Sequence, residues 1–488
     1  MNPKKGYESK IKKLEKKIGE LEKKVADNTD KLQSHKEEIR RLKQRVRDLI
    51  RSRDKWKDKV KILRQDLKKV KRRISRAGKA KWHHYHTWLI GLCVLLRIVA
   101  GCSYGSIVRI LHILNKYLEL GLTKIPCENT IHNWVSKLGL FVLQTSPVQT
   151  TTKAVSLIID ESIRLGQEKL LLILSIPFEK FKQIALRFED VTVVYMKGAK
   201  SWTGLKISQV LKELEQSYGF EVKNILSDED SKLVKAAQLS GIVHVPDIAH
   251  AVATCLRRVF EKTEEFVAFR KLLASYSSKG VNQSLSYLCP PKQRTKARFL
   301  NLSRVVKWAS KLLGKFSKLE KNETSFFNAL PAQSDFIALL EECLSLARTI
   351  SLPFKVKGLS LKSLKEAQTK IETMNLQNAY LAAFVKELKS YLTLYQEIMK
   401  PYKETTIHVS SEIIESMFGK YKNKANSYSL TGLTTLNLEL PLYGMTAEHK
   451  PLDLQVALET ISMADLRQWK NDNSHDNQLV KRRKWFKD

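Results

Sequence analysis

Residues 155–162 read VSLIIDES, a run of mostly apolar, β-branched residues that leads directly into Asp160. A short apolar run bounded by polar residues is typical of a strand that is buried on both faces of a sheet. A carboxylate at the end of such a strand is costly to bury without a partner. We therefore expect Asp160 either to cap the following segment or to belong to a site at the end of the strand.

The composition indicates a polyanionic partner. The chain has 488 residues, with 86 Lys and Arg against 50 Asp and Glu, and a formal net charge of +36. Nucleic acid is the first candidate and an anionic membrane surface the second, because an excess this large repels itself without a counter-charge. The length, together with a hydrophobic content of 43%, predicts two to four domains with real cores.

The cysteines and the N-terminus indicate the compartment. None of the six cysteines forms a C-x-x-C pair, which argues against a zinc ribbon or a redox motif and favours reduced thiols. The chain opens with charged helical sequence, and the apolar stretch 88–100 is too short for a membrane span and contains Arg97. We expect a soluble cytoplasmic protein, associated with the nucleoid, with no membrane partner.

Residues 1–80 carry an apolar heptad repeat from Ile11 to Ile74, interrupted by Asn28, His35 and Arg53. An a/d pattern sustained in this way predicts a coiled coil and a homo-oligomer, either as a parallel dimer or in an antiparallel arrangement. Residues 68–81, KKVKRRISRAGKAK, lack acids. They either contact phosphates or form a solvated basic segment.

The sequence of residues 81–145 predicts a helical, DNA-binding segment. Two apolar helices are followed by NTIHNWVSKLG, in which Asn129 is a good N-cap. Thr130, Asn133 and Lys137 share one face of this helix and could enter the major groove of DNA, while Ile131 and Trp134 face the core. The pattern indicates a helix-turn-helix. A plain three-helix bundle is the alternative, because the turn is long.

The remaining chain predicts an α/β core with a helical insertion. In residues 153–250, strands at 155–160, 169–176, 191–196, 222–227 and 242–245, with helices at 202–217 and 231–239, predict a mixed sheet with an antiparallel half. Residues 251–404 have helical spacing and form the insertion, with basic stretches at 294–298 and 304–311. Residues 405–435 hold a further core helix, and 436–488 a basic C-terminal tail.

Several acids lie at the ends of predicted elements. Asp160 ends the first strand, Asp228 ends the fourth, and Glu412 and Glu415 lie three residues apart on the late helix. Carboxylate oxygens are the ligands that Mg²⁺ prefers. Taken singly, each of these acids is also explained as a helix cap or as a favourable charge at a helix N-terminus.

The order of these motifs resembles insertion-sequence transposases of the DDE type over roughly residues 155–428. The motifs are IIDES, then ILSDEDS with GIVHVPDIAH, then SEIIESMFGKYK. The resemblance implies an RNase H-like core, two Mg²⁺ or Mn²⁺ ions, and metal-dependent cleavage and strand transfer, with element ends and target DNA as partners. It places the catalytic, metal-binding acids on Asp160, Asp228 and Glu415.

The resemblance leaves alternatives open. Glu412 is the second choice for the last acid, and Asp247 competes with Asp228 for the second position. Lys420, Lys422 and Lys424 follow the last acid along its helix and are expected to contact DNA phosphates. Two rival interpretations are a non-catalytic, transposase-derived DNA-binding regulator or tether, and a coiled-coil scaffold whose basic surface binds RNA or membrane.

Overall fold

The structure is a computed structural model and divides into two units, Met1–Gly78 and Lys79–Asp488. It describes residues 3–74, 78–145, 153–165, 168–178, 185–280, 285–292, 299–374, 376–402, 405–424, 433–445, 453–473 and 478–486. The predicted linker at 146–152 and the basic stretch at 294–298 lie outside the described residues.

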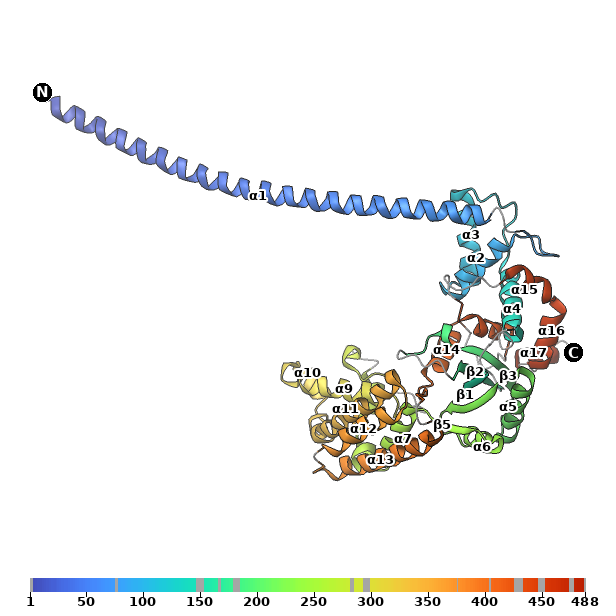
Figure 1. The fold of residues 1–488 in the computed structure, drawn as a ribbon. Helices are drawn as coiled ribbons and strands as arrows, with labels where there is room; N and C mark the ends of the chain where they lie inside the picture. Colours follow the sequence, from blue (N-terminus) through green and yellow to red (C-terminus); the bar gives the residue numbers. More distant parts are fainter. Residues whose placement is uncertain are drawn as a thin grey trace. The chain divides into compact units, whose positions relative to one another are not determined.

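The first unit is one uninterrupted helix, α1 (Pro3–Ile74), of 72 residues (Figure 1). At 1.5 Å per residue such a helix is roughly 108 Å long. Each apolar residue of its seam that the structure describes is exposed, from 43% at Val60 to 67% at Leu49. An isolated helix gains little stability from propensity alone, so this seam needs a partner to be buried.

The second unit begins with three helices, α2 (Thr87–Ile98), α3 (Tyr104–Leu118) and α4 (Glu128–Thr145). Gly101, at a φ of 72°, turns the chain between α2 and α3, and Ser103 caps α3 by accepting a hydrogen bond from Ser106 N. Ile131 and Trp134 are buried, which confirms their predicted place in the core. The helix α4 begins one residue before the expected cap Asn129.

A five-stranded mixed sheet follows, in the order β3-β2-β1-β4-β5. The pairs β1–β2 and β2–β3 are antiparallel, whereas β1–β4 and β4–β5 are parallel. The strands are β1 (Ala154–Leu165), β2 (Glu168–Pro177), β3 (Thr192–Ala199), β4 (Glu221–Ser227) and β5 (Val243–Pro246). The long β1 is therefore central, as the apolar run at 155–160 predicts.

The two faces of the sheet are covered by different helices. Leu157 and Ile159 of β1 pack with α5 (Gly204–Tyr218) and α6 (Ser231–Ser240) in one core. Ile158 points to the opposite face, because side chains alternate along a strand, and belongs to a second core with α4, α7 and α14. Asp160 lies on the same face as Ile158, and Glu161 lies on the face of α6, where it pairs with Lys232.

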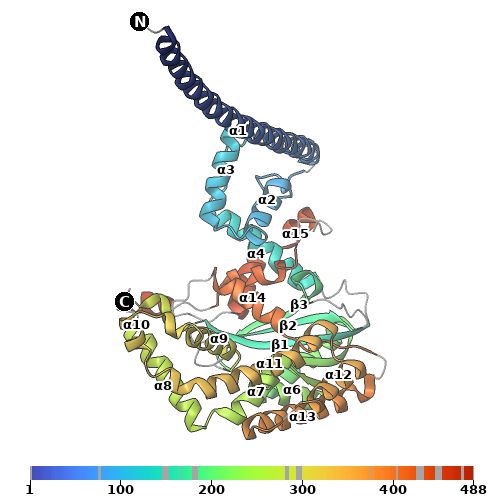
Figure 2. The same cartoon turned by 90° about the vertical axis from the view of Figure 1, so that its left-hand side faces the viewer.

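Between β5 and the last core helix, the described chain is helical. The helices are α7 (Ile248–Phe260), α8 (Glu264–Gly280), α9 (Leu302–Leu313), α10 (Lys321–Phe326), α11 (Ser334–Lys357), α12 (Leu361–Glu372) and α13 (Ala379–Met399) (Figure 2). This long excursion starts and ends at one place, since Ile248 N donates to Val409 O at 2.9 Å. The core helix α14 (Glu412–Lys422) comes directly after it.

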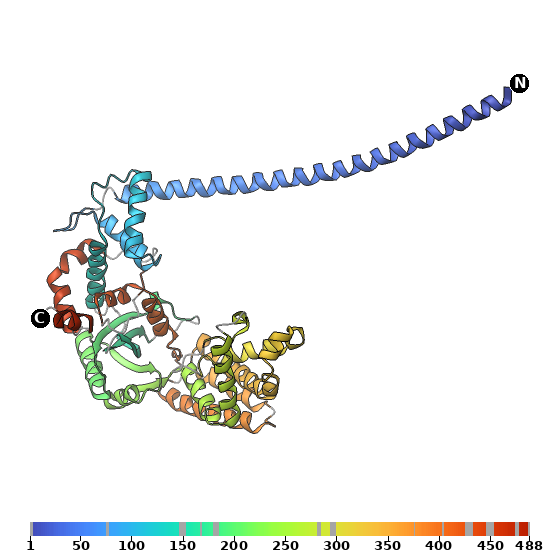
Figure 3. The same cartoon turned by 180° about the vertical axis from the view of Figure 1, so that it is seen from behind.

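Residues 436–488 differ from the expected tail. They include most of the 3-10 helix η6 (Thr435–Leu442) and all of α15 (Leu454–Thr460), α16 (Met463–Asn473) and α17 (Gln478–Trp485), with α15 and α16 packed on α4 (Figure 3). A Cβ at Gly139 of α4 would lie 1.8 Å from Leu438 O of η6, so only glycine permits this approach. No helix in the described part of the chain is both long and apolar enough to cross a membrane.

Candidate functional site

The sheet register places two of the candidate acids side by side. Ile158 of β1 is level with Leu226 of the parallel neighbour β4. Two residues further along each strand direction, Asp160 is therefore level with Asp228, which follows the end of β4. The helix α14, which carries Glu415, packs on β1.

The negative charges of these acids affect the pKa of Asp160. Burial, followed by the negative charges of Asp228 and Glu415, raises the pKa of Asp160 to about 7. Burial also raises the pKa of Asp228, although a hydrogen bond from Asp230 N at 3.2 Å works against the rise. The structure thus gathers the three carboxylates that the resemblance selected.

His250, in the first turn of α7, is a further member of the site. Burial lowers its pKa, but the hydrogen bond with Glu415 and the charges of Asp247 and Asp228 outweigh burial and raise the pKa to about 9. The protonated ring donates from Nε2 to Glu415 Oε1 at 3.1 Å. The sequence signal for this residue was the PDIAH stretch, in which it follows Asp247 by three positions.

Asp247 is a structural residue. It is 1% exposed and caps α7, because its Oδ1 accepts hydrogen bonds from Ala249 N at 2.8 Å and His250 N at 2.9 Å. Its Oδ2 accepts from Ser411 N at 2.6 Å and from Ser411 Oγ at 3.0 Å. The carboxylate therefore joins the start of α7 to the start of α14 and competes poorly with Asp228 for a ligand.

Glu412 does not join the acidic cluster. Its side chain is exposed and forms an ion pair with Lys355 at the end of α11. Glu415, one turn later, is the acid that contacts His250, and its negative charge raises the pKa of Asp160. The geometry therefore favours Glu415 over Glu412, and we call Asp160, Asp228, Glu415 and His250 the acidic cluster.

The predicted DNA-contacting face of α4 is only partly available. Thr130 and Asn133 are partly exposed, and the Thr130 hydroxyl lies 3.2 Å from Cys127 Sγ. Lys137 is 8% exposed, and its Nζ lies 3.5 Å from Leu458 O of α15 and 3.4 Å from His83 Nε2. The prediction that Lys137 contacts DNA was wrong, because α15 covers this end of the helix.

The three lysines after the last acid have different environments. Lys420 Nζ lies over the ring of Tyr443 at 4.5 Å. Lys424 is directed inward, and its Nζ donates to Arg97 O at 3.0 Å. Lys422 is exposed, and its positive charge lowers the pKa of Asp160. Of the three, Lys422 is thus the one placed to meet a phosphate near the acidic cluster.

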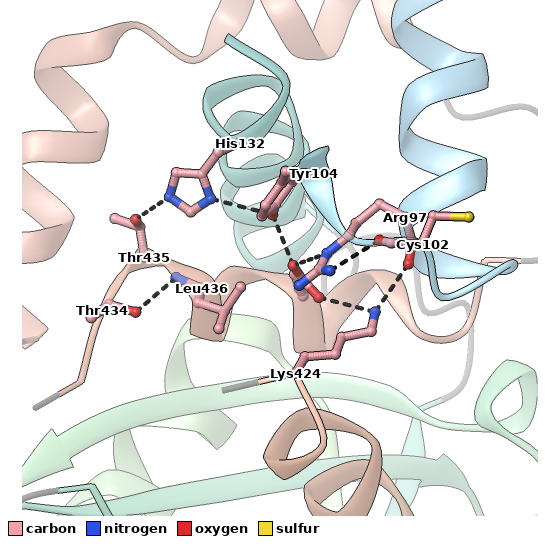
Figure 4. Close-up of polar contacts among 9 residues, drawn as sticks. Arg97, Cys102, Tyr104, His132, Lys424, Thr434, Thr435 and Leu436 are labelled. Atoms are coloured by element: carbon pink, nitrogen blue, oxygen red, sulfur yellow. Dashed lines mark hydrogen bonds and ion pairs between the residues drawn. The ribbon is translucent and has the colours of Figure 1, made fainter. Parts of the chain in front are cut away.

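A buried polar network, not anticipated from the sequence, joins α2, α3 and η6 to the residues directly after α14 (Figure 4). Its centre is Glu439 of η6, which is 1% exposed. Glu439 accepts hydrogen bonds from Arg97 Nε at 2.6 Å, Tyr104 OH at 2.8 Å and Lys424 Nζ at 3.1 Å. We call these four residues the Glu439 network. The sequence signals were Arg97 in an apolar helix and Glu439 within LNLELPL.

The network also fixes a histidine tautomer. Because Tyr104 OH donates to Glu439, it can only accept from His132 Nδ1, at 3.2 Å. The other ring nitrogen, Nε2, then accepts from the hydroxyl of Thr435 at 2.9 Å. Burial lowers the pKa of His132, which agrees with a neutral ring. This chain of bonds ties α4 to η6.

The donor set of the acidic cluster suits a hydrated hard cation. Within the described ranges, no three His, Cys, Asp or Glu side chains are arranged to hold one metal ion together. Mg²⁺ is commonly held by one or two carboxylates and keeps several waters. Asp160 and Asp228, which the sheet places side by side, provide such a pair, and burial is the main cause of the raised pKa of each.

A family model described as Tho2, transcription factor/nuclear export subunit protein 2, matches residues 1–103, which include α1 and α2. This is not a transposase family. The match overturns the transposase assignment, with its enzyme class of phosphodiester cleavage and strand transfer, and also the rival interpretation as a transposase-derived regulator or tether. No curated protein matches the chain.

Proposed function

We propose that this protein binds DNA, self-associates through α1 and holds a hydrated Mg²⁺ between Asp160 and Asp228. The observation that carries DNA binding is the net charge of +36. The phosphate backbones of nucleic acids are the partners that such a charge attracts most strongly. The description of the matching family names a transcription factor, which supports DNA, and names nuclear export, which favours the nucleus over the nucleoid.

The fold proposal concerns residues 153–250. The order β3-β2-β1-β4-β5, with two antiparallel and two parallel pairs, supports an RNase H-like sheet. Fold does not establish function, so no reaction follows from this likeness. We propose the sheet as a rigid frame that holds the acidic cluster beside bound DNA.

DNA binding is tested by the salt dependence of affinity. We expect the full chain to bind a duplex of 30 base pairs with a log K against log [salt] slope of about −5 or steeper, because each neutralised phosphate contributes about −0.9. Fluorescence anisotropy at several salt concentrations measures the slope. Duplex RNA of the same sequence is the comparison, and equal or tighter RNA binding would reassign the partner. Absence of binding to both would refute the proposal.

Self-association is proposed from the exposed seam of α1. Apolar residues at 53–59% exposure, such as Ile11, Leu14 and Leu32, recur every heptad, and nothing in the described ranges covers them. Burying one such side chain is worth about 1.5–3 kcal/mol. A second copy of α1 provides a matching seam, because the same repeat faces itself across a two-stranded coiled coil.

The variant Leu42→Gln/Leu49→Gln is expected to weaken the dimer at least about 100-fold, because it removes two seam leucines per chain while keeping good helix formers. Sedimentation equilibrium measures the effect. The control, Arg41→Gln/Asp48→Gln, changes neighbouring residues outside the seam. A wild-type chain that stays monomeric at 50 μM (roughly the scale of weak interfaces) would contradict the proposal.

A further inference from the structure

A lysine-lined groove runs along α12, from the end of α11 to the end of α12. It has a volume of about 570 Å³ and is lined by Lys357, Lys362, Lys365 and Lys370, with Glu366 as its acidic residue. The four lysines are exposed. Counting these five side chains gives a local charge of +4 − 1 = +3. We call these four lysines and the hollow between them the lysine groove.

The local structure explains why the lysines line one hollow. Lys362 and Lys365 are three residues apart on α12, so they share a face of the helix with Thr369. Ser360 caps α12 by accepting from Ser363 N at 3.2 Å. Lys357 is the last residue of α11, across the turn at Gly358, whose φ is 72°. The two helix ends thus direct their basic side chains towards the same space.

Among the residues that the structure describes, most of this charge has no counter-ion. Lys357 pairs with Glu366 at 3.2 Å. Lys362, Lys365 and Lys370 have no ion-pair partner in the described part of the chain. From Lys362 to Lys370 the helix rises about 12 Å. That length corresponds to roughly three base-pair steps of one DNA strand, and it exceeds what a single phosphate ion can span.

The end of α11, next to the groove, is joined to the start of α14. Lys355, two residues before the end of α11, forms the ion pair with Glu412 in the first turn of α14. The turn between α11 and α12 is held to the segment before α14 by paired hydrogen bonds of Leu359 and Ile407, at 2.8 and 3.0 Å. Glu415 follows one turn after Glu412. These contacts fix the start of α12 next to the segment that leads into α14.

We infer that the lysine groove binds consecutive backbone phosphates of duplex DNA. This inference rests on the proposed function. It adds a DNA-contacting surface on α12, separate from Lys422 of α14. The spread of the three unpaired lysines over about 12 Å favours a continuous strand over a free anion.

The test compares two triple variants of the full chain. Lys362→Gln/Lys365→Gln/Lys370→Gln removes the unpaired lysines of the groove. Lys206→Gln/Lys212→Gln/Lys235→Gln removes three exposed lysines of α5 and α6, on the opposite face of the sheet from α14. We expect the groove variant to bind duplex DNA about tenfold or more weakly at 100 mM salt, with a salt slope reduced by about 2–3 units, and the control to change by less than about threefold.

A footprint on the wild-type chain is independent of any folding defect. Acetylation of exposed lysines, measured by mass spectrometry with and without DNA, should show Lys362, Lys365 and Lys370 protected and Lys206 and Lys212 unchanged. If the wild type binds DNA but the groove variant has the control's affinity and slope, the groove inference fails and the proposed function stands. Groove lysines that are modified equally in free and bound protein would also refute the groove inference alone. If the wild type binds no DNA, both fail.

Discussion

Replacing Glu439 with glutamine is expected to lower the free energy of unfolding by about 3–5 kcal/mol, because it leaves two buried cations without their counter-charge. The carboxylate is 1% exposed and pairs with Arg97 and Lys424, whose side chains are 6% and 10% exposed. The substitution keeps the shape of the side chain. The loss therefore reports charge rather than packing. Urea unfolding of the full chain, followed by tryptophan fluorescence, measures it.

The matched control is Glu387→Gln, which breaks the surface pair between Glu387 and Arg258 at 2.8 Å. Pairs exposed to solvent are usually worth 1 kcal/mol or less, so this change should cost about 0–1 kcal/mol. The double variant Arg97→Met/Glu439→Leu removes Glu439 and one of its two cations, so that only Lys424 stays without a counter-charge, and it should recover part of the loss. Equal losses for Glu439→Gln and Glu387→Gln would show that the Glu439 network does not hold the fold as described.

Asp160→Asn is expected to flatten the pH dependence of stability. The folded chain holds the pKa of Asp160 at about 7, against 3.8 for the ordinary side chain. Between these values the folded state binds more protons than the unfolded state, so stability falls as pH rises through this window. From pH 5 to pH 8 the wild type should lose about 2–3 kcal/mol through this group, and the variant should not.

Unfolding free energies at pH 5 and pH 8 measure this difference. Asp472→Asn, at an exposed position of α16, serves as the control and should follow the wild type. The same variants test the cation. Mg²⁺ at ten times its Kd should stabilise the wild type by about 1.4 kcal/mol at pH 8 but leave Asp160→Asn unchanged. Parallel curves for wild type and variant would remove Asp160 from the cluster.

The strands were predictable because each contains a local pattern of apolar, β-branched residues. Apolar, β-branched runs at 155–160 and 222–227 predicted β1 and β4 within a few residues, and helical spacing predicted the excursion between β5 and α14. Register then placed Asp160 beside Asp228, which a sequence can suggest only through the position of each acid at the end of its strand. These parts of the site depend on local patterns.

The remaining parts depend on contacts between distant segments. LNLELPLY has neither helical nor strand periodicity, so the sequence does not predict η6, although packing on α4 buries it. Lys137 and Lys424 looked like surface lysines because their helices gave no indication of what covers them. The family was predicted wrongly from three short motifs, and the match over residues 1–103 lies outside all of them.

The closure between Ile248 N and Val409 O has a consequence for the order of folding. A flexible loop of that length would cost about 4–5 kcal/mol to close, which one hydrogen bond cannot offset. We therefore expect the excursion to become compact first, by forming α7 to α13 and packing them together. On this expectation α14 reaches β1 late, and the acidic cluster is assembled after the sheet and the helices that flank it.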